Sequence, residues 1–130
     1  MRLLARAATI AGSVALIAGG LSAGSASAAS FCDHLQRGWG SACFESWGDL
    51  FKVRDGKADG YRVVAIWETD YGRSGECHNA TGANPSNWVT CNYDMKETGS
   101  VRFRVCLRDG ATGLNQSCEF WTQWWDIGAF

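Results

Sequence analysis

The sequence predicts an all-β protein, a small antiparallel β-sandwich stapled by disulfide bonds. Three observations support this fold class. Short runs of β-forming residues are separated by glycine-rich turns, one run alternates cleanly between apolar and basic residues, and six cysteines lie between positions 32 and 118. No segment shows a helical stripe of apolar residues. Together these features favour a sandwich of about five or six short strands.

The first residues have the features of a cleavable signal peptide. Arg2 and Arg6 give a basic start, and a short apolar stretch follows from Ala7 to Leu21. Small residues then end in Ala26-Ser27-Ala28, a typical cleavage site. The apolar stretch is broken by glycines and is short for a membrane span. We therefore predict that residues 1–28 are a signal peptide and that the mature protein is secreted and extracellular.

The remaining residues are predicted to form one mildly acidic domain. Two of the 12 basic residues leave with the signal while all 13 acidic residues stay, so the net charge falls from -1 to about -3. Such a charge gives no attraction to nucleic acid or to anionic membranes. We therefore expect neither a nucleic-acid nor a membrane partner, and another secreted protein or a carbohydrate instead.

The six cysteines predict a disulfide framework, because the signal directs the chain to an oxidising compartment. Spacing alone does not fix the pairing, and we favour the sequential set because each bond would close a short loop or hairpin. The predicted bonds are Cys32–Cys43, Cys77–Cys91 and Cys106–Cys118. A zinc site is the alternative, but the chain has no C-x-x-C motif and its only histidines are His34 and His78. We expect neither a metal site nor a cofactor.

Residues 29–49 are predicted to form an irregular N-terminal arm. Glycines interrupt this segment, and neither a strand period nor a helix period is visible. A bond between Cys32 and Cys43 would close part of the arm into a loop. The sandwich domain itself is predicted over residues 50–130.

The next strands are separated by turn signals. Phe51–Arg54 is a short strand, followed by turns at Asp55-Gly56 and Asp59-Gly60. Tyr61–Trp67 carries apolar residues on both faces, which suits a strand buried between two layers. Trp88–Tyr93 is a further strand.

The last part of the chain predicts a hairpin. Apolar and basic residues alternate from Val101 to Arg108, and Ser117–Asp126 is expected to return as the final strand. If Cys106 faces Cys118, the two faces of the hairpin follow from a constant register. One face then carries Arg102, Arg104, Phe120 and Trp124, and the other carries Val101, Phe103, Val105, Trp121 and Trp125. The expected architecture is an antiparallel sandwich of the immunoglobulin-like or a similar type.

No catalytic constellation is visible in the sequence. A Cys–His pair needs a free thiol, and pairing all six cysteines leaves none. Most carboxylates sit beside glycines in turns, and chance pairs among 13 acidic residues do not define a glycosidase site. Asp55 to Gly60 faintly resembles a calcium loop, but Lys57 breaks the alternation of ligands, so two turns are the better interpretation. We expect no enzyme activity and no catalytic residue.

The segment between Cys32 and Cys43 is the first candidate binding feature. If bridged, it is a constrained loop that presents Arg37 and Trp39. A pre-ordered loop loses less entropy on binding, and Arg and Trp are typical anchors of protein interfaces. Such a loop suits insertion into a protease-shaped cleft, as an inhibitor or as a structural plug. The alternative is that it only covers one end of the core.

The C-terminal aromatic cluster is the second candidate, with Trp121, Trp124 and Trp125 as its binding residues. Adjacent residues of a strand point to opposite faces, so Phe120-Trp121 and Trp124-Trp125 cannot all enter one core. The surplus rings would stack on sugars or contact another protein. The alternative is that they cap the sandwich.

The pattern of turns and cysteines resembles that of small secreted proteins of actinomycetes. It runs from Asp55-Gly56-Lys57-Ala58-Asp59-Gly60 through Gly75-Glu76-Cys77 and Cys91 to Phe103-Arg104-Val105-Cys106. Among such proteins it is similar to the adaptor subunits of the umbrella-shaped toxin particles secreted by Streptomyces. This resemblance implies a protein that joins a lectin-bearing subunit, through its degenerate protease-like domain, to a repeat-bearing toxin chain.

The sequence thus predicts a secreted, non-enzymatic protein-binding module. The resemblance favours an adaptor subunit of a multi-subunit extracellular antibacterial toxin complex. An inhibitor of a secreted hydrolase, either a trypsin-like protease that receives Arg37 or an amylase, is the alternative. A carbohydrate-binding module based on the tryptophan cluster is the third hypothesis.

Overall fold

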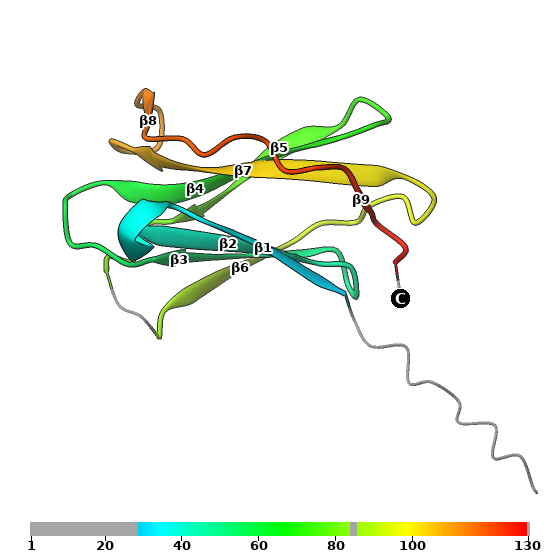
Figure 1. The fold of residues 1–130 in the computed structure, drawn as a ribbon, viewed down its shortest axis with the longest axis horizontal. Coiled ribbons are helices and arrows are strands. Elements are labelled where there is room, and N and C mark those ends of the chain that lie inside the picture. Colours follow the sequence, from blue (N-terminus) through cyan, green and yellow to red (C-terminus); the bar gives the residue numbers. More distant parts are fainter. Residues whose placement is uncertain (1–28, 84–85, 130) are drawn as a thin grey trace, which may run out of the picture.

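The computed structural model describes residues 29–83 and 86–129, which form a β-sandwich of two antiparallel sheets (Figure 1). The all-β fold class predicted from the sequence is confirmed. The predicted signal peptide, residues 1–28, lies outside the described residues. Within the described ranges, no helix is long and apolar enough to cross a membrane.

The first sheet has four strands in the order β1-β2-β3-β6. Their bounds are β1 (Ser30–His34), β2 (Gly40–Glu45), β3 (Leu50–Asp55) and β6 (Trp88–Asn92). A short 3-10 turn, η1 (Gln36–Gly38), joins β1 to β2. Since β1 and β2 pair antiparallel and β2 continues into β3, the N-terminal hairpin is part of the sheet.

This hairpin corrects the prediction that residues 29–49 form an irregular arm. Both strands are regular, and Cys32 lies directly opposite Cys43 in the register. The period of β2 is hidden in the sequence because small residues occupy both faces and the strand is buried almost throughout. At Gly40, a Cβ atom would lie 2.7 Å from a methyl carbon of Val63, so glycine permits the close approach of the two sheets. The sandwich therefore includes the segment that was predicted as an arm.

The second sheet has the order β5-β4-β7-β8, with β9 also paired to β7. Its strands are β4 (Arg62–Thr69), β5 (Ser74–Asn79), β7 (Ser100–Arg108), β8 (Asn115–Gln116) and β9 (Trp125–Asp126). The alternation predicted for β7 is present, since its apolar residues are buried while Arg102 and Arg104 are half-buried on the other face. The sequence gives no strand signal for β5, which pairs along most of β4.

The core lies between the two sheets and is built around three aromatic rings. Phe51 of the first sheet packs against Trp67 and Phe103 of the second, with ring centroids 6.0 and 5.4 Å apart. All three side chains are buried. Further fully buried core residues include Phe44, Val53, Val63, Val101, Val105 and Ile127. Burial of these large apolar side chains is the main stabilising term of the fold.

The six cysteines are paired in the sequential set that the sequence predicts. Cys32–Cys43 joins the two strands of the first hairpin, and Cys106–Cys118 joins β7 to the C-terminal segment. Cys77–Cys91 connects β5 of the second sheet to β6 of the first, so it links the two layers directly. The sandwich is thus cross-linked within each sheet and between the sheets.

The C-terminal segment differs from the predicted final strand. Only two short pieces pair with β7, with Gln116 opposite Leu107 and Trp125 opposite Val101. The segment therefore advances nine residues while β7 advances six, so it contains three extra residues, which are distributed as single-residue bulges along it. Between the two pieces, two backbone N–H groups donate to β7 carbonyls over 2.9 Å. The constant register predicted for this hairpin is wrong, because a bulge changes the face that each later side chain occupies.

Candidate functional site

The hairpin loop between β1 and β2 is the first candidate binding feature. Leu35 is buried at its base, and its N–H donates to Gly40 O over 2.9 Å. Arg37 stands in the turn with φ 59°, a left-handed conformation that is uncommon for residues other than glycine. Its side chain is exposed. The loop thus presents Arg37 at the end of the sandwich where β4 begins (Figure 1).

This loop is held against the loop between β3 and β4. Gly56 N–H donates to Trp39 O over 3.0 Å. A Cβ atom at Gly56 would lie 2.1 Å from Gly38 O, so the two backbones are in direct contact. The Cys32–Cys43 bond fixes the other end of the hairpin. The loop is therefore ordered by contacts within the protein itself.

Trp39 is the centre of a small basic cluster. The centroid of its ring lies 3.9 Å from Lys57 Nζ and 5.9 Å from Arg37 Cζ, within the range of cation–π interactions. The ring is half-buried and also packs against the core. We call Arg37, Trp39 and Lys57 the hairpin-end cluster. The sequence does not predict the role of Lys57. Lys57 lies in a turn, and nothing in the turn sequence indicates that its side chain will lie over the Trp39 ring.

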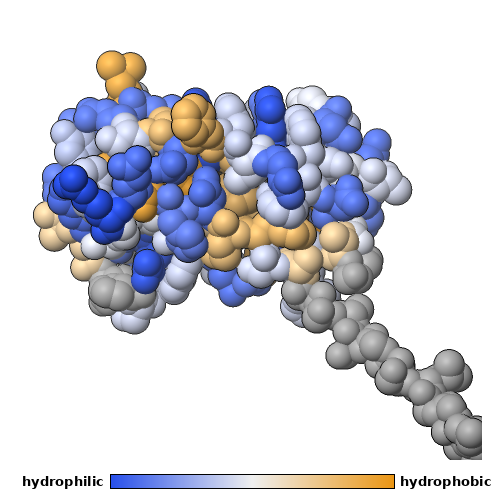
Figure 2. Space-filling view, viewed as in Figure 1, coloured by the Kyte–Doolittle hydropathy of each residue, from blue (hydrophilic) through white to orange (hydrophobic). Residues whose placement is uncertain are grey.

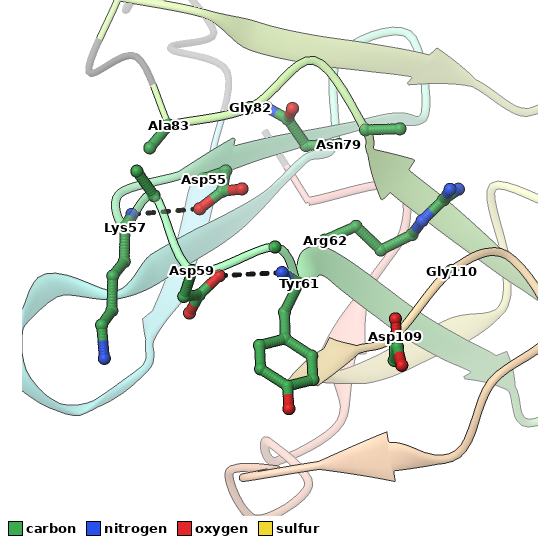
Figure 3. A pocket seen from close by; sticks show the side chains of 13 residues that line it. Asp55, Lys57, Asp59, Tyr61, Arg62, Asn79, Gly82, Ala83, Asp109 and Gly110 are labelled. Carbon is green, nitrogen blue, oxygen red and sulfur yellow. Dashed lines mark hydrogen bonds between the residues drawn. The ribbon is translucent and has the colours of Figure 1, made fainter.

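A pocket of about 630 Å³ adjoins the hairpin-end cluster (Figure 3). Lys57 belongs to both, and in Figure 3 its side chain extends away from the carboxylate of Asp55. Asp55, Asp59 and Asp109 line the pocket together with Tyr61 and with a second basic residue, Arg62. The hairpin end therefore carries positive charge, and the pocket beside it carries three carboxyl groups next to two basic side chains.

Two of the pocket carboxylates also shape the backbone. Asp55 Oδ1 accepts a hydrogen bond from Lys57 N–H over 3.0 Å, and Asp59 Oδ1 accepts one from Tyr61 N–H over 2.9 Å. These are Asx turns, as expected for Asp beside Gly. Asp55 is 2% exposed, and its burial, with a further contribution from the charge of Asp59, raises the pKa of its carboxyl.

The three carboxyl groups of this pocket can accept hydrogen bonds from a cationic side chain. Among the residues that the structure describes, no group of three His, Cys, Asp or Glu side chains is arranged to hold a metal ion. A lysine or arginine of another protein that enters the pocket would instead contact the carboxylates of Asp59 and Asp109 and approach the buried Asp55. Such a contact would also offset the cost of keeping Asp55 charged.

The second candidate feature, the C-terminal tryptophans, divides into two parts. Trp121 and Trp124 lie on the outer face of the second sheet beside two arginines of β7. Arg102 Cζ lies 5.0 Å from the ring centroid of Trp121 and 4.7 Å from that of Trp124. Arg104 Cζ lies 5.0 Å from the centroid of Trp121. We call these four residues the Arg–Trp stack. The prediction that Trp121 lies on the apolar face is wrong, because the bulge turns it to the basic face.

The two arginines of the Arg–Trp stack differ in their partners. Arg102 Nε donates to Glu68 Oε1 over 2.6 Å, so its charge is paired. Arg104 has no acidic partner within the described part of the chain, and its Nε is buried without an acceptor. Phe120, which precedes Trp121 in the chain, is 93% exposed. Figure 2 shows hydrophobic side chains that protrude from the surface over β8 and the segment after it. This face therefore combines an unpaired positive charge with exposed aromatic area.

Trp125 does not belong to that surface. Its ring stacks on Phe31 of β1 with centroids 4.0 Å apart, and it is half-buried. The stacking covers the side of the sandwich where the first and last strands meet. Trp125 therefore has a structural position, unlike Trp121 and Trp124.

A small cavity of about 210 Å³ lies between the two candidate features. It is lined by Leu35, Gln36 and Trp39 of the hairpin loop and by Ser117, Cys118 and Glu119 of the C-terminal segment. The hairpin-end cluster and the segment that carries the Arg–Trp stack are thus neighbours. One faces the end of the sandwich, and the other covers its second sheet.

No protein family, curated protein or solved structure matches this chain. The candidate site is therefore defined by the geometry and charge of its own residues.

Proposed function

We propose that the protein is a secreted, non-enzymatic binding module that acts as an adaptor subunit of a multi-subunit extracellular antibacterial toxin complex. In this proposal the hairpin-end cluster contacts one partner protein. The observation that carries it is the order of the loop: a disulfide, a hydrogen bond to Trp39 O and the contact of Gly38 with Gly56 hold the loop in place. A loop fixed in this way loses little conformational entropy when a partner binds.

The charges around the loop describe the partner surface. Arg37 and Lys57 flank the Trp39 ring, so this part favours a partner that presents a carboxylate next to apolar area. The adjoining pocket holds three carboxyl groups beside Lys57 and Arg62, and these carboxyl groups would pair with a basic side chain of the partner. A partner with both charges at matching positions would be selected over others, because a mismatch places like charges together.

An adaptor also needs a second contact area. The Arg–Trp stack supports this part of the proposal, because it faces outward from the second sheet while the hairpin-end cluster faces the end of the sandwich. Arg104 and Phe120 give it an unpaired charge and an exposed apolar side chain. The resemblance of the turns and cysteines to toxin-particle adaptors supports the particular assembly.

The geometry of Arg37 favours an adaptor over an inhibitor of a trypsin-like protease. A substrate-like inhibitor presents its arginine from an extended backbone that pairs with the edge of the protease cleft. Arg37 instead has φ 59° and ψ 19° within a tight turn. Presenting it as a substrate would require the loop to unfold from its contacts with Gly56.

Recovery of complexes from culture fluid tests the proposal. The full chain is expressed with a C-terminal tag in the producing bacterium, and the tagged protein is isolated under native conditions. We expect large secreted companions to be retained by the wild type and by the control variant Lys96→Ala, and to be lost from Arg37→Gly. A stoichiometric protease in their place would support the inhibitor hypothesis. Recovery of the wild-type protein without any companion would contradict the adaptor proposal.

A further inference from the structure

The outer face of the first sheet carries a surface that neither candidate feature includes. The register of β2, β3 and β6 arranges its side chains in rows across the strands. One row contains Ser41, Arg54 and Trp88, and the next contains Cys43, Lys52 and Thr90. An aromatic ring thus stands beside a row of polar groups on a regular sheet face.

Trp88 is exposed but held in place. Its side chain is 41% exposed, and Arg54 Cζ lies 5.5 Å from the centroid of its ring. Arg54 Nη2 also donates to Ser41 Oγ over 3.4 Å, which ties the guanidinium to β2. The ring is therefore supported from the sheet by a cation–π contact and keeps exposed area for a ligand.

A groove of about 340 Å³ runs beside this ring, lined also by Cys43, Glu45, Lys52 and Thr90. Lys52 Nζ lies 2.9 Å from Glu45 Oε1, and both side chains remain partly exposed. The pair supplies a hydrogen-bond donor and an acceptor without net charge. Cys43 is bonded to Cys32, so one part of the wall is cross-linked. The groove is preformed, and the opposite charges of Lys52 and Glu45 pair within it.

We propose that this groove binds a neutral pyranose oligosaccharide. A pyranose ring has an apolar face of C–H groups and a rim of hydroxyls, so it is recognised by a flat aromatic surface beside paired polar groups. Trp88 supplies the stacking surface. Glu45 accepts hydrogen bonds from sugar hydroxyls, Lys52 donates to them, and the hydroxyl of Thr90 does either.

Charge and size favour this ligand class over the alternatives. Glu45 would repel the carboxylate or sulfate of an acidic glycan placed beside Lys52. The groove volume lies at the lower end of the range of about 300–1,000 Å³ for small-ligand sites, which suits sugar rings. Trp88 lines a groove, whereas Trp121 and Trp124 line none of the three cavities described here.

Isothermal titration of the mature protein with cellohexaose, chitohexaose, xylohexaose and mannohexaose tests the proposal. We expect the wild type to bind at least one of these sugars, and Trp88→Ala to weaken that binding at least about tenfold. Trp88→Phe keeps an aromatic ring and should retain part of the affinity, which separates loss of the platform from loss of folding. Trp47→Ala is the matched control, since Trp47 is 67% exposed in a turn outside the groove.

Absence of binding to all four sugars at about 10 mM would overturn the proposal. Unchanged affinity in Trp88→Ala, or an equal loss in Trp47→Ala, would do the same. The sugar site is independent of the protein partner proposed above. Arg37→Gly should therefore lose its companion proteins and keep the full affinity for the sugar.

Discussion

Phe31 and Trp125 stack with their ring centroids 4.0 Å apart and their planes inclined by 15°. Phe31 lies in β1 at the edge of the first sheet, and Trp125 lies in β9 of the second, so one contact joins the two ends of the domain. Four residues after Trp125, the Ala129 carbonyl accepts a hydrogen bond from Ser46 Oγ over 2.6 Å. The side of the sandwich where the termini meet is thus closed by side chains and not by strand pairing.

We expect Trp125→Ala to lower the free energy of unfolding by about 2 kcal/mol, since a half-buried stacked ring contributes less than a fully enclosed one. Urea denaturation measures this change. The control Trp47→Ala should change the same quantity by less than about 0.5 kcal/mol. Equal effects of the two variants would show that the ring of Trp125 does not close the sandwich.

The disulfides differ in what they join, although their sequence separations of 11, 14 and 12 residues are similar. Loop entropy alone would give each bond about 3 kcal/mol. We expect the double variant Cys77→Ala/Cys91→Ala to be less stable than Cys32→Ala/Cys43→Ala. Cys77 is fully buried and its bond links the two sheets, whereas Cys32–Cys43 joins strands that already pair. If the two double variants have equal midpoints of urea denaturation, the disulfides stabilise the fold only through the entropy of the unfolded chain.

The Glu76–Arg108 ion pair predicts a dependence of stability on pH. The hydrogen bonds from the buried Arg108 guanidinium, followed by the contact with His78, lower the pKa of the Glu76 carboxyl below its ordinary value of 4.5. The charged form is therefore favoured in the folded state, and its stabilisation is present above pH 4.5 and lost as the pH falls through the folded pKa.

The variant Glu76→Gln measures this effect. Its deficit in the free energy of unfolding should be largest at neutral pH and should shrink as the pH falls below 4.5. Glu97→Gln is the control, since Glu97 is exposed and forms no ion pair within the described residues. A deficit for Glu76→Gln that stays constant down to about pH 2 would contradict the assignment.

The sequence predicts the fold class and β7 because each has a local signal, and it predicts the disulfide pairs because neighbouring cysteines close short loops. Alternation along β7 reports one buried and one outer face directly. The first hairpin has no such signal, since the first four residues of β2 are small on both faces and Gly40 packs closely against Val63. β5 also lacks a local signal, and its conformation follows from its pairing with β4.

The candidate site is less visible in the sequence than the fold. The exposure of Arg37 follows from its place in a disulfide-closed loop, but the contact of Trp39 with Lys57 depends on how two loops meet. The position of Trp121 depends on single extra residues spread along the C-terminal segment, and no local sequence pattern predicts them. Trp88 gains its polar neighbours only through the register of three strands.

Gly56→Ala tests whether the order of the hairpin loop matters. Its Cβ would lie 2.1 Å from Gly38 O, so the two loops must separate. We expect faster hydrogen exchange at residues 35–39 with unchanged protection of β7, and binding of the companion protein at least about tenfold weaker. Unchanged affinity with a loosened loop would mean that pre-ordering does not contribute to binding.

The affinity of Arg37→Gly for the companion protein isolated from culture fluid tests the central claim most directly. Glycine adopts φ 59° without strain, so this variant removes the side chain and keeps the loop. We predict an unchanged or raised Tm and binding weakened at least about tenfold, or about 1.4 kcal/mol, while Lys96→Ala binds like the wild type. Equal affinity of Arg37→Gly and the wild type would contradict the assignment of the hairpin-end cluster as the partner-binding site.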